Sequence, residues 1–345
     1  MHLIIDIRST IPQNPIIARY ASDWVDLWRI RHPWDTISYI HFGNQESPEN
    51  GWSVVVGPSY WWWKNKSLSI KWVNELFRCI NFSSYAPYDN RIITISHIFH
   101  HGDILYPQSE NSWKEKIIGT YSKHYIQKSK KIVVPALSIG QETVDITHIP
   151  EEDIEIIPYI KLNPWKWDHH ILPQLWILWE YWLYDGSYGS EANIPALIHW
   201  YKDYRELGGT HSLILMWSTK SSELRTISDL IQNMNLTGLV RVIGSFEWAS
   251  MESIYMNASG WIYIGAYYTG GPRIELARSH NVPLLISHIS SLEDYHTNAT
   301  TLHPNHLKEL GQSLRNLEKN RKTEKQKLSN DSIMIVYEKI ISEKR

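Results

Sequence analysis

The chain has 345 residues, 43% of them hydrophobic and 20% charged, which is the composition of a globular protein of about two domains. Its formal net charge of −2 argues against the strongly basic field of a nucleic-acid-binding protein. Cys79 is the single cysteine, so an internal disulfide and a cysteine metal cluster are both excluded.

Hydropathy predicts where the protein resides. The chain has no run of about 18 apolar residues, and its most apolar stretch, 171–184, is interrupted by Pro173, Gln174 and Glu180. The first residues, MHLIIDIRST, are typical of a strand and are too short and too charged for a signal peptide. We therefore expect a cytoplasmic protein.

Apolar runs and helical periodicity predict alternating strands and helices in the first half of the chain. Helices are expected at Ala21–Trp28, Trp113–Lys131 and near Gly140–Thr147. Strands are expected at Leu3–Ile7, Ile37–Phe42, Ser53–Val56, Arg91–Ser96, Ile132–Pro135 and within Pro150–Ile160. The proline-containing polar stretch Asn163–Pro173 is typical of a linker.

The second half continues the alternation. Strands are expected at Trp176–Trp182, Leu213–Met216, Val240–Ile243, Trp261–Ile264 and Val282–Ser287. Helices are expected from Ser190 or Glu191 to about Leu207, over Met251–Asn257, from near Arg273, over Leu307–Lys327, and over Asp331–Ile341. The last of these has an apolar face made of Ile333, Ile335, Val336, Ile340 and Ile341.

Residues 236–304 carry the most information about function. A glycine turn (Gly244–Ser245) follows one strand, and a glycine-rich loop (Thr269–Pro272) follows the next and leads into a helix. Strands and helices in this order build a parallel sheet, with ligands at the carboxyl ends of its strands. In order, spacing and its Gly-Gly-Pro-x-x-Glu core, this stretch resembles the nucleotide-sugar half of the GT-B retaining glycosyltransferases, the group 1 or family 4 superfamily.

The resemblance implies an α/β protein with two Rossmann-like domains whose parallel sheets face an interdomain cleft. An amino-terminal, acceptor-side domain would cover residues 1–162, and a nucleotide-sugar-binding domain would cover residues 174–328. The last segment, 329–345, would be a helix that packs back on the first domain.

The same resemblance implies a set of donor-site residues. Gly244 and Ser245 match the turn that cups the nucleotide base, and Gly270, Gly271 and Pro272 match the donor loop. Glu275 matches a glutamate that holds the ribose hydroxyls, a role suited to an acceptor-only carboxylate. An exposed helix-terminal carboxylate that interacts with the helix dipole is the structural alternative for Glu275.

Several positions depart from the family pattern. The first glutamate of the pair falls at Tyr267, which can hydrogen-bond a sugar but carries no permanent charge. The loop before the helix near residue 190 keeps Asn193, but Ala192 replaces the lysine that neutralises the donor diphosphate, and no arginine lies there. Arg273 is the candidate to compensate. Pro15–Ala21 keeps the family's Arg-Tyr pair at Arg19 and Tyr20 but lacks the glycines of its loop.

His97 ends a predicted strand where the resemblance places a histidine that touches the transferred sugar or the acceptor, followed by Asp103 and Pro107. A loop histidine without a special role is the alternative. His97, His100 and His101 also suggest a metal site, but no carboxylate or cysteine accompanies them at ligand spacing.

These features lead to an expected function with alternatives. The resemblance implies a hexosyltransferase that moves a sugar from a nucleotide-diphosphate donor to a cell-envelope glycan or lipid-linked acceptor, with His97, Arg273 and Tyr267 as catalytic candidates. No metal or other cofactor and no nucleic acid are expected, and contact with the inner membrane face would be peripheral. A non-catalytic relative that binds a nucleotide sugar or a partner enzyme is the alternative, and a nucleotide-sugar epimerase is a weaker one.

Tryptophan is unusually frequent, with 18 residues beside only 5 phenylalanines. An aromatic core and sugar stacking are two explanations. A third starts from position, because Trp217 follows a strand where the resembled family turns on glycine, Trp61–Trp63 follow Gly57-Pro58, and Trp165 and Trp167 lie in the linker. On this hypothesis, some of these codons are read as glycine in the source organism.

Overall fold

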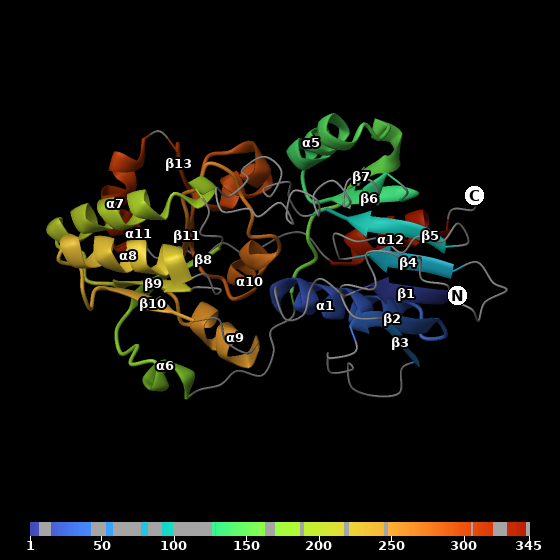
Figure 1. Cartoon of the computed structure of the whole chain (residues 1–345), viewed down its shortest axis with the longest axis horizontal. Coiled ribbons are helices and arrows are strands. Elements are labelled where there is room, and N and C mark those ends of the chain that lie inside the picture. Colours follow the sequence, from blue (N-terminus) through green and yellow to red (C-terminus); the bar gives the residue numbers. More distant parts are fainter. Residues whose placement is uncertain are drawn as a thin grey trace. The chain divides into compact units, whose positions relative to one another are not determined.

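A computed structural model describes residues 1–6, 15–42, 53–57, 77–81, 92–98, 126–127, 129–162, 170–186, 190–216, 221–244, 248–304, 306–319 and 330–342 (Figure 1). These residues form two compact units. The first takes the described residues up to Ile160 together with Asn330–Ser342, and the second takes those from Lys161 to Lys319. In both units helices alternate with parallel strands, so the predicted α/β class is confirmed.

The described strands of the first unit form one parallel sheet in the order β3-β2-β1-β4-β5-β6-β7. Its strands are β1 (His2–Asp6), β2 (Thr36–Phe42), β3 (Ser53–Gly57), β4 (Phe77–Asn81), β5 (Ile92–His97), β6 (Lys131–Val134) and β7 (Ile154–Ile156). The described helices are α1 (Pro15–Arg31), α5 (Leu137–Thr147), η1 (Glu151–Asp153) and α12 (Asn330–Ser342). Leu3, Ile4 and Ile5 are buried, as expected for a parallel strand covered on both faces.

Helix α1 is longer than its sequence pattern predicts, because it begins at Pro15 and not at Ala21. The segment expected to match a glycine-rich loop is therefore helical, which is consistent with a proline in the first turn and the absence of glycine. Inside the helix, Arg19 and Asp23 form a buried i,i+4 ion pair at 2.8 Å. One turn further on, the rings of Trp24 and Trp28 stack at 5.4 Å.

The last helix, α12, packs on the first unit, beside the strands drawn in blue and cyan in Figure 1. Tyr337 meets the ring of Trp24 edge-on at 5.4 Å, and Glu338 accepts hydrogen bonds from Arg31 at 2.6 Å and His32 at 2.9 Å. The hydrogen bond from Arg31 lowers the pKa of the Glu338 carboxyl. Polar and aromatic contacts thus join α12 to α1 and to His32, which follows it.

The apolar face predicted for α12 is correct at three positions and wrong at two. Ile333, Ile340 and Ile341 are buried, whereas Ile335 and Val336 are exposed. Met334 and Tyr337 occupy the buried stripe in their place. The reason is the 3.6-residue period, which places residues 333, 334, 337, 340 and 341 on one side of the helix.

The described strands of the second unit also form one parallel sheet, in the order β10-β9-β8-β11-β12-β13. Its strands are β8 (Tyr181–Asp185), β9 (Ser212–Met216), β10 (Val240–Ile243), β11 (Gly260–Tyr263), β12 (Leu284–Ser287) and β13 (Thr300–Leu302). The described helices are α6 (Ile171–Gln174), η2 (Ser190–Ala192), α7 (Ile194–Glu206), α8 (Ser221–Asn233), α9 (Trp248–Met256), α10 (Arg273–Ser279), η3 (Ser290–Asn298), η4 (Leu307–Glu309) and α11 (Leu310–Lys319).

The strand predicted at Trp176–Trp182 exists but lies further along the chain, because the chain is irregular from Leu175 to Glu180 and β8 begins at Tyr181. All five residues of β8 are buried, as are the four of β11 beside it. A central parallel strand has no polar face and so shows no alternation that would mark its start. The predicted lysine-rich helix Trp113–Lys131 lies largely outside the described residues. In the described ranges no helix is both long and apolar enough to span a membrane.

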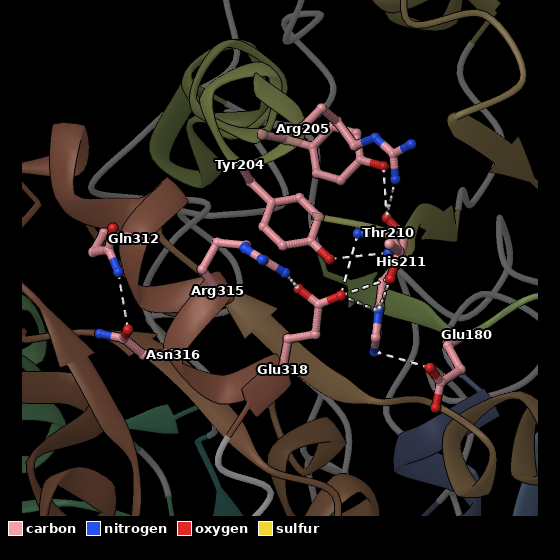
Figure 2. Close-up of polar contacts among 10 residues, drawn as sticks. Glu180, Tyr204, Arg205, Thr210, His211, Gln312, Arg315, Asn316 and Glu318 are labelled. Atoms are coloured by element: carbon pink, nitrogen blue, oxygen red, sulfur yellow. Dashed lines mark hydrogen bonds and ion pairs between the residues drawn. The ribbon is translucent and has the colours of Figure 1, made fainter. Parts of the chain in front are cut away.

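A polar cluster made of Thr210, His211, Arg315 and Glu318 lies beside the amino-terminal ends of β8 and β9 (Figure 2). Glu318 accepts a hydrogen bond from the Thr210 hydroxyl at 2.6 Å, lies 3.2 Å from His211 Nδ1, and is paired with Arg315. Partial burial opposes ionisation of Glu318, but the hydrogen bonds from Thr210 and Arg315 outweigh it and lower its pKa to about 2. The cluster fastens α11 to the edge of the sheet opposite the strands' carboxyl ends.

Candidate functional site

The candidate site lies at the carboxyl-terminal edge of the second sheet. Strands β8 and β11 are parallel neighbours, so Asp185 at the end of β8 and the loop that follows Tyr263 emerge side by side. This edge is where ligands bind in open α/β sheets. The loop after β11 leads into α10, drawn in orange in Figure 1.

An ion pair joins the two segments at this edge. The Nε atom of Arg273 lies 3.1 Å from Oδ1 of Asp185, and Nη1 of Arg273 donates to the carbonyl of Gly270 at 3.0 Å. The other carboxylate oxygen of Asp185 accepts a hydrogen bond of 2.6 Å from the hydroxyl of Tyr255, which comes from α9. Arg273 is therefore held from two sides.

Burial and charge together set the protonation states of this group. Burial lowers the pKa of Arg273, but the charge of Asp185 outweighs it, and the net pKa is raised above its ordinary value. Burial and the charge of Asp185 raise the pKa of the Tyr255 hydroxyl well above 10. Arg273 is consequently a permanent cation, and Tyr255 is a permanent hydrogen-bond donor.

The loop between β11 and α10 requires its glycines. Gly271 has φ = +57°, a left-handed conformation that glycine adopts without strain. A Cβ atom on Gly270 would lie 2.6 Å from the ring of Tyr268. The Tyr268 hydroxyl in turn donates to the carbonyl of Gly271 at 2.8 Å and accepts from the amide of Ile274 at 3.2 Å. The Gly270-Gly271-Pro272 loop is thus wrapped around a buried tyrosine, and α10 begins immediately after it.

Glu191 connects this loop to the segment that follows β8. Its carbonyl accepts from the amide of Ala266 at 2.7 Å, and its carboxylate lies 3.5 Å from the hydroxyl of Thr269. The next turn contains Asn193, which has left-handed backbone angles and whose carbonyl accepts from Leu197 in the first turn of α7. The structure therefore brings Asn193 and Arg273 into segments that are joined by hydrogen bonds.

Tyr267 and Glu275 lie on the same loop and helix. Tyr267 is buried, and its carbonyl accepts a hydrogen bond from Tyr263. Glu275 is 1% exposed and pairs with Arg278 at 2.7 Å, so the interpretation of Glu275 as an exposed helix-terminal carboxylate is wrong. The guanidinium of Arg278 lies over the ring of Tyr295, with its Cζ 4.9 Å from the ring centre.

The other predicted site residues lie elsewhere. Gly244 is exposed after β10, and Ser245 lies outside the described residues. His97 belongs to the first unit, where its Nε2 atom lies 2.8 Å from the hydroxyl of Tyr337 in the wall of a small cavity. His100, His101, Asp103 and Pro107 lie outside the described residues, and the described ones contain no group of three or more histidine, cysteine, aspartate or glutamate side chains arranged to hold a metal.

Sequence reasoning missed Asp185, Glu191 and Tyr255. Asp185 was not identified as a site residue because the strand was expected to end at Trp182, which placed the aspartate in a loop. An acidic residue at the end of the wholly buried run Tyr181–Asp185 is the signal that could have identified it. Glu191 and Tyr255 gave no such signal, since their roles depend on contacts with residues 75 and 70 positions away.

Comparisons with known proteins identify the fold. No protein-family model and no curated protein sequence matches the chain. Among solved structures, it is similar to Anabaena Alr3699/HepE in complex with UDP-glucose, with a TM-score of 0.66 and 14% identity over 94% of this chain and 91% of that one. Sucrose-phosphate synthase from Thermosynechococcus elongatus gives a TM-score of 0.65 and 12% identity over 93% of this chain and 90% of that one.

Staphylococcus aureus TarM, whose structure contains UDP, is also similar, with a TM-score of 0.57 and 11% identity over 77% of this chain. The chain covers 55% of TarM, so it spans about half the length of that relative. These similar structures are glycosyltransferases of the GT-B type. At this level of identity, the likeness establishes the fold. The chain has the GT-B fold.

Proposed function

We propose that this chain is a glycosyltransferase that moves a hexose from a nucleotide-diphosphate sugar to a cell-envelope glycan or lipid-linked acceptor, with retention of configuration. The observation that supports it best is the Gly270-Gly271-Pro272 loop, which presents Arg273 at the carboxyl edge of the second sheet. The GT-B fold and the nucleotide ligands in the structures of HepE and TarM agree with this proposal.

The donor would bind to residues of the second unit. Gly244 and Ser245 would receive the base, and the buried carboxylate of Glu275 would accept hydrogen bonds from the ribose. The diphosphate would lie near Arg273 and the amino-terminal turn of α7 after Asn193, because backbone amides and a guanidinium stabilise negative charge. No metal ion is needed in this scheme.

The chemical step would depend on stabilising the leaving diphosphate. Charge develops there as the glycosidic bond to the donor breaks, and a fixed guanidinium stabilises that charge without having to reorganise. Tyr267 would contact the transferred sugar, and His97 of the first unit would contact the sugar or the acceptor. We place the reaction in the cytoplasm, with peripheral contact at the membrane face where a lipid-linked acceptor would lie.

The experiment is a screen of nucleotide-sugar donors with the purified chain. Release of nucleoside diphosphate is measured with and without glycan and lipid-linked acceptors, and the anomeric configuration of the product is read by NMR. Acceptor-dependent release with retention supports the proposal. Binding of a donor without turnover would favour a non-catalytic nucleotide-sugar-binding protein, and sugar interconversion without an acceptor would favour an epimerase.

A variant of Glu275 tests the donor site. Glu275→Gln keeps the shape of the side chain and a carbonyl that accepts from Arg278, so the fold should survive. Losing one charge-assisted hydrogen bond to the ribose should weaken donor binding about tenfold. Calorimetric titration of wild type and variant measures this, and equal affinities would remove Glu275 from the donor site.

A further inference from the structure

Three residues from different elements form a chain of contacts that ends at the guanidinium of Arg273, at the carboxyl edge of the second sheet. Asp185 ends β8, Tyr255 lies on α9, and Arg273 opens α10. The contacts form a chain, from the Tyr255 hydroxyl to Asp185 Oδ2 at 2.6 Å and from Asp185 Oδ1 to Arg273 Nε at 3.1 Å. In the part of the chain that the structure describes, Nη2 of Arg273 makes no hydrogen bond, the contact of Nε with Asp185 is an ion pair without hydrogen-bond geometry, and the side chain keeps 12% of its surface exposed.

We propose that Tyr255 and Asp185 are positioning residues that hold Arg273 as the cation for the donor diphosphate. This inference rests on the proposed function. Ala192 supplies no charge in the segment after β8, and we therefore assign the diphosphate to Arg273, the first residue of α10. An arginine held by an ion pair at Nε and by a hydrogen bond from Nη1 loses little side-chain freedom when Nη2 binds an anion. Asp185 fixes Nε, and Tyr255 fixes the carboxylate.

Calorimetric titration with nucleoside diphosphates (UDP, GDP and ADP) and with the corresponding nucleosides tests this role. Arg273→Gln should weaken diphosphate binding by tenfold or more and leave nucleoside binding unchanged. Tyr255→Phe should weaken diphosphate binding by only a few-fold, because it removes one oxygen and no charge. Arg225→Gln, on the exposed side of α8, is the charge-matched control and should change neither affinity.

The outcomes are separable. If wild type binds the diphosphates and both variants bind them as wild type does, the positioning role is overturned while the proposed function stands. If a variant loses diphosphate and nucleoside binding equally, Tyr255, Asp185 and Arg273 have only a structural role, and the positioning role is again overturned. If wild type binds none of the nucleotides, the proposed function itself fails and this inference fails with it.

A different observation concerns Trp176. Among the described residues, five that are not glycine have a positive φ: His148, Asn193, Asn235, Asn281 and Trp176. Asparagine and histidine enter this region more readily than other side chains, whereas a bulky aromatic residue there is a clear exception. Trp176 has φ = +54°. Its side chain is 73% exposed, so burial of the ring does not offset the energetic cost of the strained backbone.

The hydrogen bonds around Trp176 define a specific motif. Helix α6 ends at Gln174, and the amide of Ile177 donates to the carbonyl of Leu172 at 2.9 Å, while the amide of Trp176 donates to that of Pro173 at 2.9 Å. This pair of bonds is the Schellman motif, and Trp176 occupies its left-handed position, which is usually glycine. The backbone around residue 176 is thus built for a residue without a side chain.

Seven tryptophans of the described chain lie at the two extremes of burial. Trp24, Trp28, Trp182 and Trp261 are fully buried in the two cores. Trp34, Trp176 and Trp179 are 93%, 73% and 75% exposed and lie in turns or bends. The whole sequence contains 18 tryptophans and only 17 glycines. We infer that residue 176 is glycine in the native protein, because its codon is one that the source organism reads as glycine.

Tandem mass spectrometry of the protein purified from its own cells decides the point. One tryptic peptide, Trp167–Lys202, contains position 176 together with Trp182, which serves as the internal control. We expect glycine at 176 and tryptophan at 182. Tryptophan at 176 overturns the inference, as does a UGG codon there, since UGG is read as tryptophan.

For the recombinant chain, Trp176→Gly should raise the midpoint of thermal unfolding and Trp182→Gly should lower it; a lower midpoint for Trp176→Gly also counts against the inference.

Discussion

Replacing Glu318 by glutamine should destabilise the second unit, and the effect should depend on pH. The carboxylate accepts hydrogen bonds from the amide of Thr210 at 3.2 Å and from its hydroxyl at 2.6 Å, and it is paired with Arg315. His211 Nδ1 lies 3.2 Å away, and the ring of this histidine stacks on Trp182 at 4.9 Å. The Glu→Gln change removes the charge and keeps the size of the side chain.

The pKa of Glu318 sets the magnitude. A carboxyl whose pKa falls from 4.5 to about 2 on folding contributes up to about 3 kcal/mol at neutral pH, and solvent at a side chain that is 11% exposed reduces this to about 2 kcal/mol. Because folding lowers this pKa, the contribution is complete above the unfolded value of 4.5 and declines as the pH falls toward 2. By about pH 3.5 some 40% of it should be lost.

Urea unfolding of wild type and Glu318→Gln, followed by far-UV circular dichroism from pH 7 to about pH 3.5, measures this contribution. The difference in unfolding free energy should be about 2 kcal/mol at pH 7 and should shrink as the pH falls. Glu206→Gln is the matched control, since Glu206 is 64% exposed and its pair with Lys202 spans 3.8 Å. A difference that stays constant over this pH range would refute the reasoning.

Two further predictions concern the glycine loop and the hydrogen bond of His97. Gly270→Ala should destabilise the protein by about 1–3 kcal/mol and abolish donor binding, because its Cβ would meet the Tyr268 ring, whereas Gly244→Ala should leave the stability unchanged, since no atom of the described residues lies within 4 Å of its Cβ. Thermal unfolding separates the pair, and equal midpoints would contradict this account. Tyr337→Phe should cost about 1 kcal/mol by removing the 2.8 Å hydrogen bond to His97; unchanged stability would show that this bond contributes nothing.

The sequence predicted the fold where hydrophobic runs are bounded by turn residues. Strand β10 was predicted at its observed bounds, Val240–Ile243, because Gly244 follows it directly. The opening of α10 near Arg273 was predicted correctly, because Gly270, Gly271 and Pro272 end the preceding loop. In both cases a local rule was sufficient, since glycine and proline restrict the backbone without reference to distant residues.

The parts that were missed depend on tertiary contacts. Strand β4 (Phe77–Asn81) and helix α8 (Ser221–Asn233) were not predicted, and the start of β8 was placed five residues too early. The apolar and aromatic residues between Leu175 and Glu180 look like a strand, yet the chain there is irregular and its backbone carbonyls accept from Arg241 on β10. A hydrogen bond across 65 positions is not visible in a local pattern.

The two ends of β8 can be tested as independent sites. At the amino end, Glu180 lies 3.6 Å from His211, which is part of the cluster with Glu318; at the carboxyl end, Asp185 holds Arg273. Five residues of strand separate these ends by roughly 16 Å. Substitutions at two sites this far apart, with no shared partner, should change the unfolding free energy additively to within about 0.5 kcal/mol. The double variant Glu318→Gln, Arg273→Gln should therefore show the sum of the two single losses in stability and the diphosphate affinity of Arg273→Gln alone. A larger coupling would mean that β8 transmits strain from one edge of the sheet to the other, and the loss of binding in Arg273→Gln could then no longer be assigned to the guanidinium itself.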